Sequence, residues 1–422
     1  MKTVVAAGAL DTKGADYGFL VERLRSHGVR PLTVDFGVLG DPPFVPDVNS
    51  AEVARAAGVD LATLRELKDK TLAMRTMADG LPHILSRLRA EGRLDGVCGM
   101  GGSGGTTILA GGVRALPLGV PKLLISTVAA GDVSAYVDTA DVTMMHSVVD
   151  VAGLNRISRQ IYANAAAAIA GMVQAVRPES ATQRPLLAAS MFGNTTACID
   201  RAGASLDRAG WEVLVFHATG TGGRTMQRLA AEGLLAGLID LTTTELADEV
   251  CGGVFSAGPK RIDIGAACAI PVVLAPGCVD MCNFGPRDTV PARYGARLLY
   301  EWNANVTLMR TTVEENRRIG AMIAETANRC AGPVVVLLPL RGVSMLDSPG
   351  GPFWDEEADR ACFDAIRSRL KPGIPVIELD VNINDPVFAD RATRVFLELS
   401  APLDVATSGA AGSQAQMRQD NL

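Results

Sequence analysis

The chain has 422 residues, of which 48% are hydrophobic and 20% charged, and its formal net charge is −6. Domains usually divide once they exceed about 250–300 residues, so this length predicts two domains. Proteins that bind nucleic-acid backbones present basic surfaces, so the acidic balance leads us to expect no nucleic-acid partner. The net charge places no restriction on binding of small anions.

The sequence also favours a cytoplasmic protein without a membrane partner. No apolar run is long enough to span a bilayer, and the first residues, MKTVVAAGALDTKG, lack the features of a signal peptide. Eight cysteines are scattered through apolar segments, which suits a reducing compartment. Cys278 and Cys282 are closely spaced, but the four histidines are not spaced like zinc ligands, so we expect buried thiols and no metal site.

Short apolar segments alternate with longer amphipathic ones from the first residues onward. A strand is predicted at 2–8, a helix at 15–28 and a strand at 29–37, which is the βαβ pattern of a parallel sheet. The same order returns over 184–220. The sequence therefore predicts an α/β protein.

The similarity between the two halves continues along the chain. LDGVCGMGGSGGTT (94–107) corresponds to LAGLIDLTTTELAD (235–248), and 118–132 corresponds to 268–282. Closing helices are predicted at 155–176 and 303–328. We interpret this as an internal duplication of a Rossmann-like unit, giving two lobes with mainly parallel sheets and a cleft between them; chance similarity of two α/β halves is the alternative.

The predicted boundaries follow from this duplication. We expect an N-terminal nucleotide-binding lobe at 1–180, a C-terminal lobe at 181–405 and a flexible tail at 406–422, with a hinge near 176–185. Residues 331–400 have no counterpart in the first half. Strands predicted at 332–339 and 373–380 and a helix at 355–370 should extend the second sheet.

The segment GVCGMGGSGGTTIL (96–109) is the strongest local signal. Gly99, Gly101 and Gly104 formally match the dinucleotide pattern G-x-G-x-x-G, but the acidic residue for the ribose is missing about twenty residues later, and no lysine follows as in a Walker A loop. One interpretation is a set of backbone N–H groups for phosphate or carboxylate oxygens; the other is a tight turn that needs glycine for positive φ or close packing. The glycine content favours an anion site made of Gly101, Gly102, Ser103, Gly104, Gly105, Thr106 and Thr107.

Two further polar turns follow strands of the same predicted sheet. Asp11, Thr12 and Lys13 follow the first strand: Lys13 is a candidate charge for phosphates, and Asp11 a candidate for Mg²⁺ or a ribose hydroxyl. The alternative is that Asp11 or Thr12 caps the next helix. Ser126 and Thr127 are candidate hydroxyl donors, with a helix cap as the equal alternative.

The second half offers its own polar turns. A second candidate anion loop contains Thr219, Gly220, Gly222, Gly223 and Arg224 and follows His217, which is either structural or an acid–base group. Glu245 reads as part of a capping box. Thr243, Asp280 and Asn283 follow later strands, and His217 and Asp280 are the catalytic candidates.

Taken together, these motifs resemble the Tm-1-like ATP-binding family. The resemblance covers about residues 3–400 and rests on LDTK (10–13), GGSGGTT (101–107), GVPKLLISTVAAGD (119–132), VFHATGTGGRTM (215–226) and DMCNFGPRDTVP (280–291), among others. It implies two Rossmann-like lobes, self-association into a homo-oligomer, and ATP binding at residues 11–13 and 101–107. Asn382 stands where the family usually has a histidine, so that position cannot be a required general base.

From the motifs and this resemblance we expect a nucleotide-binding protein that prefers ATP, with or without Mg²⁺. One form of the hypothesis is an enzyme that uses ATP on a small anionic metabolite in the cleft. The other is a binding module, without catalysis, that the nucleotide regulates.

Overall fold

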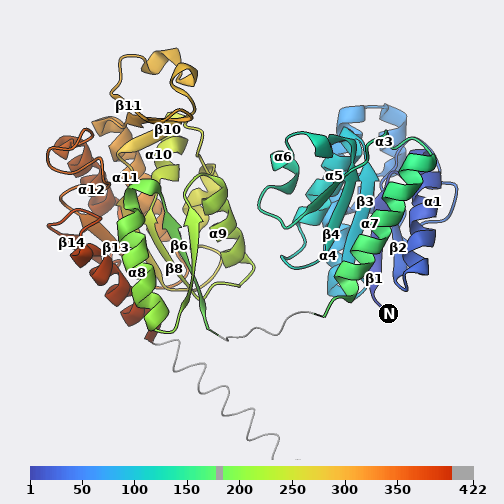
Figure 1. Cartoon of the computed structure of the whole chain (residues 1–422), viewed down its shortest axis with the longest axis horizontal. Helices are drawn as coiled ribbons and strands as arrows, with labels where there is room; N and C mark the ends of the chain where they lie inside the picture. The colour runs from blue at the N-terminus through green and yellow to red at the C-terminus, as the bar shows by residue number, and fades with distance from the viewer. Residues whose placement is uncertain (177–183, 402–422) are drawn as a thin grey trace, which may run out of the picture. The chain divides into compact units, whose positions relative to one another are not determined.

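The predicted βαβ units form two lobes, which divide between residues 179 and 180 (Figure 1). The structure is a computed structural model and describes residues 1–176 and 184–401. Most of the expected hinge and the whole expected tail lie outside the described residues. No helix in the described ranges is long and apolar enough to cross a membrane.

The N-terminal lobe has one parallel sheet with the strand order β2-β1-β3-β4-β5. Its strands are β1 (Thr3–Gly8), β2 (Arg30–Asp35), β3 (Gly96–Gly101), β4 (Lys122–Ser126) and β5 (Thr143–His146). Its helices are α1 (Leu10–Ser26), α2 (Ser50–Ala56), α3 (Leu61–Leu67), α4 (Lys70–Ala90), α5 (Ser103–Arg114), α6 (Ser134–Val137) and α7 (Arg156–Gln174).

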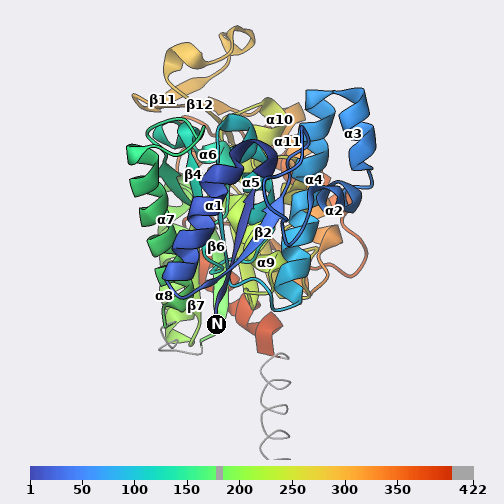
Figure 2. The ribbon, with the colours of Figure 1, turned by 90° about the vertical axis from the view of Figure 1, so that its right-hand side faces the viewer.

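Helices cover both faces of this sheet, so β1 and β3 are buried along their whole length. Alternate residues of β1 enter different cores: Val4 packs with α1 and α7, and Val5 packs with α4 and α5. Figure 2 shows α1 and α7 on one side of the sheet and α2, α3 and α4 on the other. The alanine-rich part of α7 buries Tyr162, Ala165 and Ala166 in the core of its own lobe.

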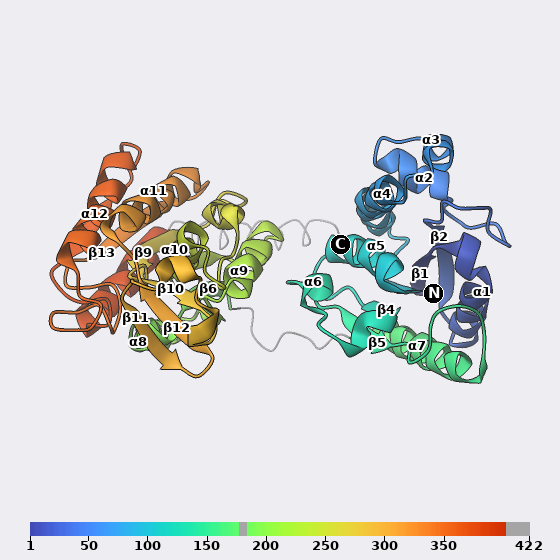
Figure 3. The same ribbon diagram turned by 90° about the horizontal axis from the view of Figure 1, so that it is seen from above.

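The C-terminal lobe has a parallel sheet with the strand order β14-β13-β9-β8-β6-β7. Its strands are β6 (Leu186–Met191), β7 (Glu212–His217), β8 (Gly237–Thr242), β9 (Val272–Gly277), β13 (Val334–Pro339) and β14 (Val376–Leu379). Its helices are α8 (Thr196–Arg208), α9 (Thr221–Ala231), α10 (Thr244–Cys251), α11 (Val313–Arg329), α12 (Glu356–Arg369) and a helix over residues 386–401. Figure 3 shows α8 on one side of the sheet and α9, α11 and α12 on the other.

The order β2-β1-β3-β4-β5 of the N-terminal sheet matches the order β7-β6-β8-β9-β13 of the C-terminal sheet. This match agrees with the duplication inferred from the sequence. β3 and β8 occupy the same place in their sheets, as do β4 and β9. The expected extension is confirmed, because β13 pairs with β9 and β14 pairs with β13.

An antiparallel sheet of β10 (Met281–Phe284), β12 (Val306–Arg310) and β11 (Leu299–Asn303) was not predicted. The helix expected from residue 303 begins only at Val313, where Thr312 provides the N-cap. The prediction was wrong for 306–310 because these residues alternate between the two faces of a strand that pairs on both edges.

Candidate functional site

The candidate site lies where the strand order of the N-terminal sheet reverses. The helix after β1 packs on one face of the sheet and the helix after β3 packs on the other, so the turns after these adjacent strands meet at the same edge. In open α/β sheets, ligands bind outside the carboxyl ends of the strands at this point. The glycine segment follows β3, and the turn with Asp11 follows β1.

The glycines of this segment fall into two groups. A Cβ on Gly99 would approach Leu109 Cδ2 to 2.5 Å, and one on Gly101 would approach the Gly105 backbone to 3.1 Å, so close packing explains both. At Gly102 and Gly105 the nearest atoms would be 3.8 and 3.9 Å away, and at Gly104 only the flexible end of Met74 would be close, at 3.1 Å.

None of the glycines at 101, 102, 104 and 105 has a positive φ. A turn that requires glycine conformations is therefore not the reason for the motif. Neither backbone conformation nor packing within the described residues accounts for Gly102 and Gly105. A glycine in such a place lets a ligand approach the backbone closely.

The same residues form the start of α5. Gly102 is the N-cap and has no side chain to cap the helix, and the first bond of the helix runs from Thr106 N–H to the Gly102 carbonyl at 2.9 Å. The N–H groups of Ser103, Gly104 and Gly105 precede that bond and have no partner within the helix. Free N–H groups and the positive end of the helix dipole together favour an anion.

The hydroxyl groups near the segment have different roles. Thr106 is buried and its Oγ1 lies 2.6 Å from Ser126 Oγ, which also accepts a bond from Val128 N–H and so caps a short 3-10 helix. Thr107 donates to the Ser103 carbonyl at 2.9 Å. The hydroxyls of Ser103 and Thr127 have no hydrogen-bond partner among the described residues, so they are the two that remain for a ligand.

A cavity of about 600 Å³ adjoins the segment and fits a ligand of nucleotide size. Gly105 and Ile108 line it from α5, and Asp11 and Thr12 line it from the first turn of α1, directly after β1. The remaining wall is mainly apolar and comes from the turn after β2 and from α3 and α4. It includes Phe36, Val38, Leu39, Leu64, Ala73, Met74 and Met77.

Lys68 and Lys70 also line this cavity. Both are exposed, and neither forms an ion pair or a side-chain hydrogen bond with the described residues. The sequence interpretation missed them, because KDK (68–70), which joins the end of α3 to the first residue of α4, reaches the cavity only through tertiary packing. They give the cavity positive charge that no carboxylate of the described chain neutralises by direct contact.

Asp11 ties two turns together. Its Oδ2 accepts N–H groups of Leu39 at 2.8 Å and Gly40 at 3.3 Å, so it fixes the wall contributed by the turn after β2. The alternative that Asp11 or Thr12 caps the next helix is wrong, since α1 begins at Leu10, its N-cap is Ala9, and no side-chain bond caps it. Asp35 instead accepts Leu10 N–H at 2.9 Å, and burial raises the pKa of its carboxyl group.

Lys13 follows the cavity residues Asp11 and Thr12 in the sequence, but its ammonium group binds outside the cavity. Lys13 Nζ donates to the carbonyl oxygen of Val151, and Lys13 does not line the cavity. In this structure the cationic groups at the cavity are therefore Lys68, Lys70 and Arg65. Arg65 donates to the carbonyls of Val38 and Gly40 and helps to hold the same wall.

In the C-terminal lobe, the second glycine loop already binds an anion from its own chain. The N–H groups of Gly220 and Gly223 donate to Oε1 of Glu245 at 2.7 and 2.9 Å. Oε2 of Glu245 accepts a bond from Arg261 at 2.7 Å, and Arg261 also pairs with Asp240 at 2.7 Å. All three charged side chains are buried. The capping-box interpretation of Glu245 is wrong, because its carboxylate fills the glycine loop.

Most other residues singled out in this lobe are bound internally. Gly222 has no room for a side chain, because a Cβ would lie 1.9 Å from the His217 carbonyl, and Thr219 donates to that carbonyl. Thr243 Oγ1 donates to the Ala275 carbonyl at 3.1 Å. Asn283 donates to Asp248 at 2.6 Å, and burial raises the pKa of Asp248 to about 7. Arg224 donates to Thr221 Oγ1 at 3.4 Å.

The two catalytic candidates have opposite environments. His217 is exposed at the end of β7, with its ring 5.9 Å from the Phe192 ring. Asp280 is fully buried and accepts a bond from Ser344 Oγ at 2.8 Å. Burial and the nearby Asp347 carboxylate raise the pKa of Asp280 to about 7. The Asp280 side chain has no exposed surface in this structure.

Asp280 belongs to a buried acidic cluster around Arg310. Arg310 pairs with Asp359 at 2.9 Å and with Asp347 at 3.6 Å. Three carboxylates share one guanidinium, so burial and mutual repulsion raise the pKa of Asp359 to about 9. Burial and mutual repulsion therefore favour protonation of these carboxyl groups more than water does. The described residues contain no group of ligands suited to a metal ion.

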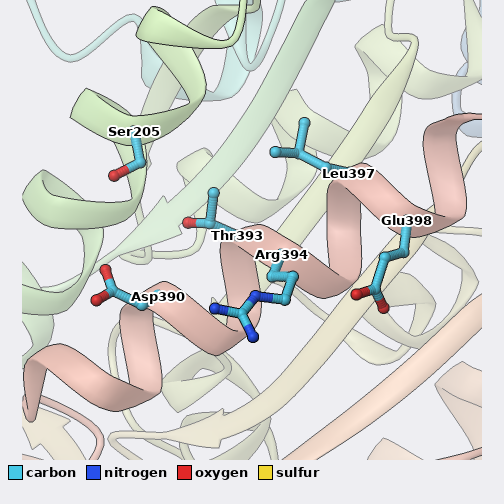
Figure 4. Close-up of a pocket in the computed structure, with 6 residues that line it drawn as sticks. All are labelled: Ser205, Asp390, Thr393, Arg394, Leu397 and Glu398. Carbon is cyan, nitrogen blue, oxygen red and sulfur yellow. The ribbon is translucent and has the colours of Figure 1, made fainter.

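A groove between α8 and the helix over 386–401 is a weaker candidate. Figure 4 shows its lining, Ser205, Asp390, Thr393, Arg394, Leu397 and Glu398. Asp390 is already held by two bonds from Arg201, at 2.7 and 2.8 Å. All six residues come from two helices, and none comes from a turn at a strand end.

The fold and these turns define a two-lobed, doubly wound α/β protein. Comparison with known proteins identifies the family of this chain. Models of the N-terminal and C-terminal domains of the uncharacterised protein family UPF0261 match residues 2–178 and 184–400, so the chain belongs to that family.

Relatives of this family occur in bacteria and in tomato. A UPF0261 protein of Clostridium tetani is 43% identical over 92% of this chain and 96% of its own length. The tomato ToMV resistance protein Tm-1(GCR237) is 38% identical over 94% of this chain, which spans 56% of the tomato protein. A Streptomyces glycosyltransferase, SsfS6, solved with thymidine diphosphate, aligns over 95% of this chain and 96% of its own with 10% identity and a TM-score of 0.18, too low to carry any argument.

Proposed function

We propose that the N-terminal lobe binds a nucleotide, with ATP preferred, and that its phosphates bind the Gly102–Gly105 segment. The observation that carries this proposal concerns Gly102 and Gly105, where neither packing nor backbone conformation requires glycine. The N–H groups beside them at the start of α5 have no capping side chain. A phosphate accepts such bonds at the positive end of a helix. Charge-assisted bonds of this kind contribute about 1.5–3 kcal/mol each.

The cavity supplies the other features that a nucleotide needs. Its apolar wall, with Val38, Leu64 and Met77, suits a base, and Lys68 and Lys70 supply charge for the phosphates. Asp11 and Asp69 are the carboxylates in its lining. They are the residues that would ligate Mg²⁺ carried by the phosphates, which normally keeps several waters and takes one or two protein carboxylates.

The proposed function has two forms, an enzyme and a regulatory module, and a measurement of ATP consumption distinguishes them. An enzyme would consume ATP only when its cosubstrate, a small anionic metabolite, is present. A regulatory module would bind ATP without consuming it over a broad metabolite panel, and its oligomeric state would respond to the nucleotide. Both forms include self-association into a homo-oligomer, which sedimentation with and without ATP measures directly.

The first experiment is a thermal-shift series with ATP, ADP, NAD and UDP-sugars, with and without Mg²⁺. At a ligand concentration of about 100 Kd, binding adds about 2.7 kcal/mol to the free energy of unfolding. For a lobe of this size that raises the melting temperature by roughly 5–10 °C. The proposal fails if no nucleotide stabilises the protein.

Gly102→Val tests the location of the phosphates. The backbone at Gly102 is extended, and the nearest atom to an added Cβ is Thr127 Oγ1 at 3.8 Å, so the variant should fold. It should lose the stabilisation by ATP. Retention of wild-type ATP binding would show that the phosphates bind elsewhere.

A further inference from the structure

A second cavity lies at the strand ends of the C-terminal lobe. It measures about 640 Å³ and is lined from the turns after β6, β13 and β14 and from the first turn of α8. These turns follow the carboxyl ends of parallel strands, which is where ligands bind in such sheets. The cavity is separate from the glycine loop that Glu245 fills, whose residues do not line it.

The lining combines apolar surface with several hydrogen-bonding side chains and carries little charge. Its hydrogen-bonding side chains are Asn194, Thr196, Asp200, Ser348, Asn382 and Asn384. No lysine, arginine or histidine lines it, in contrast to the cavity beside α5. An anionic ligand would find no counter-charge here, whereas a neutral ligand with hydroxyl groups could both donate and accept.

Two amides of this lining have an unused buried oxygen. Asn194 is 1% exposed, its Oδ1 has no partner among the described residues, and its Nδ2 contacts only the sulfur of Met281, at 3.6 Å. Asn384 donates to the Asn194 carbonyl at 2.9 Å, but its own Oδ1 is also buried without a partner. Sulfur is a weak acceptor, so turning the Asn194 amide would still leave one end unsatisfied. Buried polar atoms normally have partners, and these two point to donors supplied from outside the chain.

The amide of Asn382, by contrast, is fully used. Its Nδ2 donates to the carbonyls of Ser344 and Asp347 at 3.0 Å each, and its Oδ1 accepts Asn384 N–H at 2.9 Å. Asn382 therefore holds the turns after β13 and β14 in place and orients Asn384. The residue acts on the cavity by positioning its wall.

The aromatic ring of Trp302 lies beside Gly193, one residue of the lining. Trp302 of β11 lies so near Gly193 that a Cβ there would contact its Cζ2 atom at 3.6 Å, and 38% of Trp302 is exposed. Its indole N–H has no partner among the described residues. A half-exposed ring next to hydrogen-bonding groups offers an apolar face and a donor to one ligand.

We infer that this cavity binds a neutral polyhydroxylated compound, such as a monosaccharide or a sugar alcohol. Hydroxyl groups of the ligand donate to Asn194 Oδ1, Asn384 Oδ1 and the Asp200 carboxylate, and Ser348 and Thr196 complete the set. Trp302 lies beside Gly193, which lines the cavity, so a bound ligand changes the surroundings of its ring. The inference does not depend on nucleotide binding in the other lobe.

Calorimetry and tryptophan fluorescence of the full chain test this inference, with D-glucose, D-xylose and ribitol as probes. Trp302 is the most exposed of the three tryptophans, at 38%, whereas Trp211 is 7% exposed and Trp354 is half-buried. At least one probe should bind and change the emission. Failure of all three to bind would overturn the inference.

Two conservative variants locate the binding. Asp200→Asn and Ser348→Ala remove exposed or half-exposed polar groups without an ion pair among the described residues, so both should fold. Each should weaken binding about tenfold, the loss of one good hydrogen bond to the ligand. Ser205→Ala, in the groove of Figure 4, is the matched control and should bind like the wild type. Equal affinity in all three variants, or displacement of the probe by inorganic phosphate, would refute the assignment.

Discussion

Gly105→Ala should make the N-terminal lobe more stable and its nucleotide affinity lower. Gly105 lies in the first turn of α5 with negative φ, and an added Cβ would have nothing nearer than the Met100 carbonyl at 3.9 Å. Replacing glycine by alanine at a compatible site stabilises a protein by about 0.4–1 kcal/mol, because the unfolded chain loses freedom. For a lobe of this size the melting temperature should rise by roughly 1–4 °C.

Gly105 lines the cavity, so the added methyl group should take up space beside the open N–H groups. Loss of one charge-assisted bond costs about 1.5–3 kcal/mol, so affinity for ATP should fall roughly 10- to 150-fold. Gly111→Ala is a matched control on the same helix, where the Cβ would make an ordinary contact of 3.6 Å with the Ala78 carbonyl and no cavity residue is altered.

Thermal unfolding and calorimetry with ATP measure the two effects separately. We expect both variants to be more stable than the wild type and only Gly105→Ala to bind ATP weakly. If both variants bind ATP as the wild type does, the glycines at the start of α5 do not serve a ligand. If Gly105→Ala is less stable than the wild type, the region around residue 105 has less room for a side chain than the structure indicates.

Other predictions address the charged groups. Lys68→Ala and Lys70→Ala should each weaken ATP binding and lower its salt dependence without changing the melting temperature, since neither lysine has a partner among the described residues; unchanged affinity in calorimetry would remove them from the site. Glu245→Ala should cost about 3–5 kcal/mol in urea unfolding, because it leaves the buried Arg261 short of a counter-charge and two N–H groups unpaired; a cost below about 1 kcal/mol would contradict this. Burial raises the pKa of Asp359 to about 9, so the folded chain holds more protons there than the unfolded chain, and the free energy of unfolding should fall as pH rises from about 5 to 9. Asp359→Asn should flatten that dependence in urea unfolding, and an unchanged slope would exclude Asp359 as its source.

The sequence predicted most strands of the two parallel sheets and the turns that follow them, because apolar runs and glycine clusters depend on local physical chemistry, but it did not predict the antiparallel sheet of β10, β11 and β12. It also indicated that the turn with Asp11 and the glycine segment lie at the same sheet edge, which follows from parallel strands. It did not reveal Lys68 and Lys70 as part of that site, because α3 and α4 reach the cavity only through tertiary packing.

The roles of single polar residues were harder to predict. Glu245 has the sequence position of a capping residue, yet Arg261 and the N–H groups of two glycines bind its carboxylate in the core. Lys13 stands in the right motif, but its ammonium reaches Val151, far along the chain. These partners lie far apart in the sequence and meet only in the folded chain, so neither motif spacing nor composition predicts them.

The carboxylate of Glu245 has a lasting consequence for the C-terminal lobe. Because it is tethered to the same polypeptide, its effective concentration at the glycine loop is fixed and cannot be diluted, titrated by a solute or removed by dialysis. The folded chain itself therefore supplies the anion that orders this loop, and no solute anion is needed. A small anion added to the protein would have to displace the buried Glu245 carboxylate from Arg261 to enter there, and this competition protects the loop from small anions in solution.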